Sequence, residues 1–197
     1  MASYLAPGGE ARAEIREKGS RFLAVAGPAA DEAAARDLLA GLERELPGAT
    51  HYCWAWRLGE PARERSADAG EPAGTAGMPI LQVLRGAGLS DVMAVVVRWF
   101  GGTKLGKGGL ARAYAAAARE ALQALPVVSR VPTAKLALEV PYDKVGAVKR
   151  LIRPPEVELE TEEYGAAARL VLVVHEERRE ALLEALADLG VSPRPNP

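Results

Sequence analysis

Residues Val92–Gly109 read VMAVVVRWFGGTKLGKGG, and this stretch decides the fold. The nearly continuous apolar run at its start predicts a strand over 92–99 that is buried on both faces. The glycines and lysines that follow predict a loop. Residues 109–125 then predict a helix, because apolar side chains recur there at helical spacing. The stretch therefore predicts a buried strand, a glycine-rich loop and a helix whose first peptide N–H groups lie beside that loop.

Working outward from this stretch, the N-terminal part alternates between strand and helix patterns. Strands are predicted over 20–26 and 50–58, and helices over 31–46 and 78–85. Residues 59–77, rich in Gly, Ala, Pro and charge, are predicted to form one long loop. A loop of that length inside a compact domain is usually functional or mobile.

The rhythm changes after residues 126–132, where we place a domain boundary with one short strand at 127–128. The following segments predict the order β-α-β-β-α, which is typical of a ferredoxin-like domain. The sequence thus predicts an α+β protein with domains 1–130 and 131–197. Within the second domain, glutamates alternate with apolar residues and predict an acidic solvent face: Glu156, Glu158, Glu160 and Glu162.

The composition limits the classes of function. A formal net charge of −1 gives no general attraction to nucleic acid or anionic membranes, so any anion site must be local. The single cysteine, Cys53, excludes an internal disulfide and fits a reducing compartment. Neither a signal peptide nor an apolar run of about 20 residues is recognisable. We therefore expect a soluble, cytoplasmic protein without membrane contact or cofactor.

The glycine-rich loop is the strongest candidate site. A helix N-terminus with nearby positive charge suits a phosphate or carboxylate. The spacing approaches that of a P-loop, but Gly108 stands where magnesium coordination needs Ser or Thr. The competing interpretation is a tight strand-to-helix turn that needs glycine for steric reasons alone. The candidate residues here are Arg98, Gly101, Gly102, Lys104, Gly106, Lys107, Gly108, Gly109 and Arg112.

The loop at 68–77 offers a second set of candidates. Asp68 and Glu71 could bind a cation or act as an acid–base pair. Thr75 could instead cap the following helix, and plain solvation or capping is the better explanation of this loop. The accompanying glycines are Gly70 and Gly74.

His51 and Cys53 lie two apart on a predicted strand and so share one face. A zinc site needs about four ligands, and the chain has no second cysteine, so we predict no metal site. Structural burial is the better interpretation of Cys53. His51 is kept as a candidate imidazole facing the loops.

These motifs resemble the IMPACT family, and most closely its bacterial, YigZ-like branch. The resemblance rests on four stretches: SRF at 20–22, THYCWA at 50–55, DAGEPAGTAGMPIL at 68–81, and RWFGGTKLG with GGLARAY between 98 and 114. It covers roughly residues 15–125, and the tail fits the second domain of the branch.

The resemblance implies a first domain like domain two of ribosomal protein S-five, and a second like the last domain of elongation factor G. It also implies kinship with eukaryotic translation regulators, while the bacterial branch has no settled activity. The chain departs from the usual Asp-Asp-Gly-Glu-Pro by Ala69, and from a frequent lysine by Met78. These departures disfavour a fixed two-carboxylate mechanism.

We therefore expect a translation-linked regulatory protein that contacts RNA, the ribosome or a translation-factor partner through an anion-binding cleft. In this cleft Asp68, Glu71 and Thr75 would face Lys104 and Lys107. The alternative is an enzyme acting on a phosphorylated small molecule, and the plainest alternative is a protein-interaction module whose glycines serve folding only.

Overall fold

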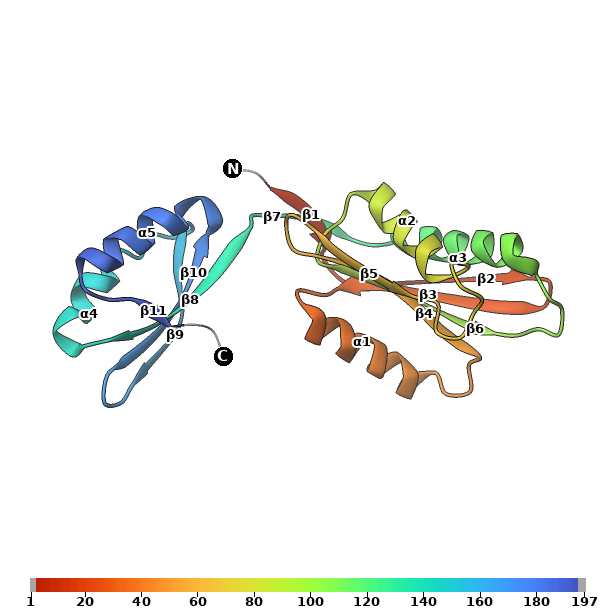
Figure 1. Cartoon of the computed structure of the whole chain (residues 1–197), viewed down its shortest axis with the longest axis horizontal. Helices are drawn as coiled ribbons and strands as arrows, with labels where there is room; N and C mark the ends of the chain where they lie inside the picture. The colour runs from red at the N-terminus through yellow and green to blue at the C-terminus, as the bar shows by residue number, and fades with distance from the viewer. Residues whose placement is uncertain (1–2, 195–197) are drawn as a thin grey trace. The chain divides into compact units, whose positions relative to one another are not determined.

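A computed structural model describes residues 3–194, which fold as two compact units (Figure 1). The first unit is Tyr4–Arg130, and the second begins at Val131. The ends of the domains predicted from the sequence, 1–2 and 195–197, lie outside the described residues. No helix among residues 3–194 is long and apolar enough to cross a membrane.

The first unit is built on a five-stranded antiparallel sheet of order β2-β3-β6-β4-β5, while β1 and β7 pair separately. The elements in chain order are β1 (Tyr4–Pro7), β2 (Ala11–Glu17), β3 (Ser20–Pro28), α1 (Glu32–Glu45), β4 (His51–Leu58), β5 (Arg63–Ala67), α2 (Gly77–Ala87), β6 (Val92–Trp99), α3 (Gly106–Gln123) and β7 (Val127–Arg130).

Strand β6 is central in this sheet and divides two hydrophobic cores. Its even-numbered residues Val92, Ala94 and Val96 pack with side chains of α2 and α3. Its odd-numbered neighbours Met93 and Val95 pack with α1 on the other face. Figure 1 shows α2 and α3 on one side of the sheet and α1 on the opposite side. The two-faced burial predicted for 92–99 is therefore confirmed.

Three expectations for the first unit were wrong in detail. The predicted loop 59–77 contains β5, a polar edge strand that pairs with β4. Its Glu64 accepts hydrogen bonds from both Arg57 and Arg85, so its polar pattern reflects surface ion pairs rather than a loop. Strands β1 and β2 were not predicted. Helix α3 begins at Gly106 rather than at residue 109.

The second unit has the strand order β11-β8-β10-β9, with every pair antiparallel. Its elements are β8 (Thr133–Val140), α4 (Tyr142–Lys149), β9 (Val157–Tyr164), β10 (Ala168–His175), α5 (Glu176–Asp188) and β11 (Pro193–Arg194). The short β11 completes the β-α-β-β-α-β order of a ferredoxin-like domain, so the predicted α+β class is confirmed.

A β-bulge corrects the predicted acidic face. The register of β9 against β10 shifts between Val171 and Leu172. As a result Glu162 lies opposite the buried Leu170 and forms an ion pair with Lys149 of α4, at 2.5 Å. An extra residue reverses the sides on which later side chains project. Glu162 therefore leaves the face that was predicted to carry four glutamates.

Candidate functional site

Three neighbouring strands bring polar side chains to one end of the sheet, on the face covered by α2 and α3. Arg98 of β6 lies in register with Phe22 of β3 on one side and with His51 of β4 on the other. These residues follow the same alternation as the core side chains before them. The apolar core thus ends, at this edge, in a polar layer.

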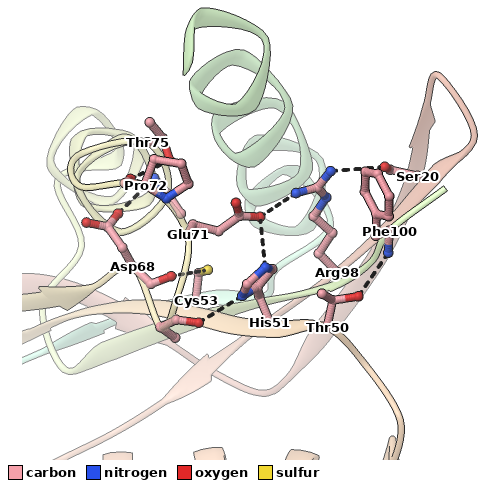
Figure 2. Close-up of polar contacts among 12 residues, drawn as sticks. Ser20, Thr50, His51, Cys53, Asp68, Glu71, Pro72, Thr75, Arg98 and Phe100 are labelled. Carbon is pink, nitrogen blue, oxygen red and sulfur yellow. Dashed lines mark hydrogen bonds and ion pairs between the residues drawn. The ribbon is translucent and has the colours of Figure 1, made fainter. Parts of the chain in front are cut away.

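A buried ion pair forms the centre of this layer (Figure 2). Arg98 Nη1 donates to Glu71 Oε1 at 2.6 Å, and the two side chains are only 5% and 3% exposed. The hydroxyl of Tyr114 on α3 donates to the same oxygen at 2.8 Å. Burial, with Cys53 and Glu71 close by, raises the pKa of Tyr114, so this hydroxyl remains a donor. Glu71 therefore connects the 68–77 loop to both β6 and α3.

Arg98 is held on several sides. Its Nη2 donates to the Ser20 hydroxyl at 3.2 Å, and its guanidinium lies 5.3 and 5.4 Å from the ring centres of Phe22 and Phe100. Its Nε has no hydrogen-bond partner within residues 3–194. Since its charge is neutralised by Glu71 inside the protein, Arg98 does not belong to an exposed anion site as the sequence suggested.

His51 of β4 contacts the 68–77 loop and holds it against the strand. Its Nδ1 lies 2.9 Å from the Ala69 carbonyl, which requires the proton on Nδ1, and its Nε2 is 3.8 Å from Glu71 Oε1. Gly70 has a φ of +90°, and a Cβ there would lie 3.1 Å from the imidazole. We call Ser20, His51, Glu71, Arg98 and Tyr114 the internal cluster. The hydrogen bonds within this cluster connect the 68–77 loop, β3, β6 and α3.

Asp68 caps the N-terminus of α2, although it lies nine residues before Gly77 in the sequence. Its carboxylate accepts the backbone N–H groups of Gly74, Ala76 and Gly77 at 2.8, 2.9 and 2.8 Å. Partial burial acts to raise the pKa of Asp68, but these three donors outweigh it and hold the pKa below its ordinary value. Thr75 does not cap the helix, because its hydroxyl donates to the Pro72 carbonyl at 2.6 Å. The capping role predicted for Thr75 belongs to Asp68.

Cys53 is buried, as the sequence predicted. Its thiol donates to the Asp68 carbonyl at 2.9 Å, and burial raises its pKa to about 12. A thiol with such a pKa is a poor nucleophile at neutral pH. Within residues 3–194 no group of three or more His, Cys, Asp or Glu side chains is arranged to hold a metal ion.

The glycine-rich loop packs against the turn between β2 and β3. A Cβ on Gly101 would lie 1.9 Å from the carbonyl carbon of Gly19, so no other residue fits this contact. Gly102 and Gly106 adopt φ values of +86° and +70°. Glycine is therefore needed for sterics at Gly101 and for backbone conformation at the other two positions.

Four basic side chains surround this loop: Lys18, Lys104, Lys107 and Arg112. All four are exposed, and none forms an ion pair with another residue of the described chain. A cavity of about 310 Å³ lies between the β2–β3 turn and α3, and its lining includes Lys18, Arg112 and one carboxylate, Glu17. We call these four side chains the basic surface.

The structure thus separates the predicted site residues into two groups. Asp68, Glu71 and Thr75 form hydrogen bonds within the 68–77 loop or with Arg98 and Tyr114, and within residues 3–194 they form none with Lys104 or Lys107. Gly70, Gly74, His51 and Arg98 belong with this first group, and the remaining predicted residues form or flank the basic surface. Sequence reasoning missed Ser20, Tyr114 and Lys18. The motifs of 20–22 and 98–114 contain the first two, but only the fold relates them to Glu71.

Comparisons with known proteins agree with this architecture. The family model of the Impact N-terminal domain matches residues 18–122, more than half of the chain. The chain belongs to the IMPACT family. A domain of unknown function, DUF1949, matches residues 138–190 in the second unit.

IMPACT family relatives resemble most of the chain. An IMPACT family member of Haemophilus influenzae is 35% identical over 95% of this chain and 93% of its own length. The member YigZ of Escherichia coli is 35% identical over 77% of this chain and 76% of its own length. A crystal structure described as a hypothetical protein is 29% identical, has a TM-score of 0.76, and is matched over 100% of this chain and 98% of its own. The resemblance to the IMPACT family inferred from the motifs is confirmed.

Proposed function

We propose that this protein is a translation-linked regulatory protein that contacts RNA phosphates through its basic surface, on the ribosome or beside a translation-factor partner. One observation carries the proposal. Four exposed cations, none with an ion-pair partner among residues 3–194, lie around the start of α3 and the neighbouring β2–β3 turn, in a protein whose formal net charge is −1. Unpaired charge concentrated in one place suits a polyanion.

The start of α3 adds backbone donors to these charges. The helix has 18 residues, no side chain caps its N-terminus, and its first turn contains no acidic residue. The first N–H groups of a helix lack intrahelical partners, and the helix dipole favours an anion there. The glycines at 106, 108 and 109 leave the backbone open to a phosphate oxygen.

Membership of the IMPACT family supports the link to translation, because the eukaryotic relatives that the motifs resemble are translation regulators. Such a role requires a cytoplasmic protein, with which a single buried cysteine is consistent. The second unit is a poorer candidate for RNA contact. Its β9 still carries Glu158, Glu160 and Glu163, whereas RNA-binding sheets of this topology present stacking aromatics and positive charge.

The alternative of an enzyme for phosphorylated small molecules has less support. Asp68 and Glu71 are engaged in holding the 68–77 loop rather than directed at the basic surface. Asp68 accepts three backbone N–H groups, and Glu71 Oε1 accepts from Arg98 and Tyr114. Both carboxylates serve the architecture of the loops, which leaves the basic surface with binding groups but no acid–base pair.

The test measures binding of a fluorescein-labelled, ten-nucleotide single-stranded RNA by anisotropy at several salt concentrations. We expect Lys104→Ala/Lys107→Ala to weaken binding at least tenfold in low salt. Each lost contact to single-stranded nucleic acid should reduce the slope of log affinity against log salt by about 0.7.

The matched control is Arg36→Ala/Arg44→Ala. It also removes two exposed positive charges that form no ion pair with any residue of 3–194, but from α1 on the other face of the sheet. Its affinity should stay within about twofold of the unmodified protein. Equal losses in the two double variants would mean that only overall charge matters, and would refute the proposed site. A phosphorylated metabolite that raises the melting temperature in the absence of any RNA binding would favour the enzyme alternative.

A further inference from the structure

A groove runs between α2 and α3 on the outer surface of the first unit. Figure 1 shows these two helices on the same side of the sheet. The groove has a volume of about 540 Å³, and neither the internal cluster nor the basic surface contributes to it. Its lining is mostly apolar or small: Pro79, Gln82, Val83, Gly86, Ala87, Ala115, Arg119, Leu122 and Gln123.

The lining residues form two helical stripes. On α2, Pro79, Val83 and Gly86 are spaced i, i+4, i+7, and on α3, Ala115, Arg119 and Leu122 repeat that spacing. The stripe on α2 covers residues 79–87, which corresponds to about 12 Å at 1.5 Å per residue. A groove of two helical turns matches the apolar anchors of one amphipathic helix, which recur at i, i+3 or i+4, and i+7.

Part of the groove lining consists of small residues and leaves open space. A Cβ built on Gly86 meets no atom within 4 Å, and Ala87 and Ala115 contribute only methyl groups. Small side chains allow an incoming helix to approach both α2 and α3 closely. Without such a helix, the apolar side chains of the groove remain in contact with water, which is unfavourable.

The polar groups of the groove indicate the charge of the occupant. Arg119 is its only charged lining residue and has no ion-pair partner among residues 3–194. The amides of Gln82 and Gln123 also have no hydrogen-bond partner in that range. A guanidinium beside two amides can bind a carboxylate. A second copy docked groove to groove would instead bring two Arg119 side chains into one interface without an acid from either groove.

We propose that the α2–α3 groove binds an amphipathic helix of a partner protein, whose apolar face packs on the lining residues and carries an Asp or Glu that pairs with Arg119. This binding site is distinct from the basic surface and does not depend on RNA contact. The protein would then connect a protein partner on one surface of the first unit with an anionic ligand at another.

The test uses a displayed library of 16-residue, alanine-based helices with five positions of one face randomised, selected on the full chain. We expect the enriched peptides to carry apolar residues at i, i+3 or i+4, and i+7, together with one Asp or Glu. They should bind Gly86→Leu at least tenfold more weakly, because the leucine side chain would occupy the open space beside Gly86 in the groove. Arg119→Glu should prefer peptides in which the acid is replaced by Lys.

The matched control is Gly146→Leu, at another exposed helical glycine whose Cβ would meet nothing within 4 Å, in α4 of the second unit. It should bind the peptides as the unmodified protein does. Unfolding of Gly86→Leu, followed by tryptophan fluorescence, should occur at no lower urea concentration, since leucine is the better helix former. Absence of enrichment, equal binding to Gly86→Leu, or a dimer of the unmodified protein that Gly86→Leu abolishes would overturn the proposal.

Discussion

Replacing Glu71 by Gln tests whether the internal cluster holds the first unit together. The substitution keeps the shape of the side chain and an acceptor for Tyr114, but it leaves the Arg98 charge without its partner at 5% exposure. Removing one member of a buried ion pair typically costs about 3–5 kcal/mol. With a urea dependence of about 2 kcal/mol per molar, the unfolding midpoint should fall by about 1.5–2.5 M.

Tryptophan fluorescence is the appropriate assay for this unit. All three tryptophans, Trp54, Trp56 and Trp99, lie within Tyr4–Arg130, so their signal follows that unit alone. The double variant Glu71→Gln/Arg98→Met removes the unpaired charge and should recover at least half of the loss, because neutral replacements of buried pairs are often well tolerated. A loss below about 1 kcal/mol in Glu71→Gln, or no recovery in the double variant, would refute the reasoning.

Three further predictions concern the two loops and the buried Cys53 of β4. Gly101→Ala should destabilise the first unit more than Gly102→Ala, because a Cβ at residue 101 would lie 1.9 Å from the Gly19 backbone. At residue 102 the added Cβ meets no atom within 4 Å, so the cost is that of the positive φ, about 1–2 kcal/mol. Urea unfolding midpoints of the two variants will decide the order. Asp68→Asn should be less stable than the unmodified protein at pH 7, and the difference in their free energies of unfolding should shrink as the pH falls below about 4. The pKa of Asp68 is lower in the folded protein than in the unfolded chain. The ionised carboxylate therefore stabilises the fold fully above the unfolded pKa, and this stabilisation is lost as the pH falls through the folded pKa. A difference in the free energy of unfolding that stays constant from pH 7 to 3 would contradict this. Cys53, with a pKa raised to about 12, should react with a thiol reagent at pH 8 only after unfolding in urea, and fast labelling of the native protein would show the burial to be wrong.

The fold was predictable where the pattern of apolar residues decides it. The run at 92–97 is buried on both faces, and burial of this kind leaves a clear signal in the sequence. Strand β5 left no such signal, because its polar side chains form surface ion pairs at the edge of the sheet. The bulge that turns Glu162 toward α4 is likewise invisible to a count of alternating residues.

The candidate site was predictable as a set of motifs but not as an arrangement. The glycines and lysines of 101–109 form a basic loop at 101–105 and the first turn of α3, and Lys104 and Lys107 are both exposed. The bond between Glu71 and Arg98 joins residues 27 positions apart. It requires the strand register that places Arg98 beside His51, and also the path of the 68–77 loop, which His51 holds through Ala69. That pairing changes the role of both residues from ligand contact to architecture, and residue types alone could not reveal it.

The most direct test of the central claim is the map of backbone amides that respond to RNA. The uniformly ¹⁵N-labelled full chain is titrated with a ten-nucleotide single-stranded oligouridine and followed by NMR. We predict that shifts concentrate in residues 18–19 and 101–112 and disappear in Lys104→Ala/Lys107→Ala. Shifts concentrated in residues 156–163 of the second unit, or none at millimolar RNA, would contradict it.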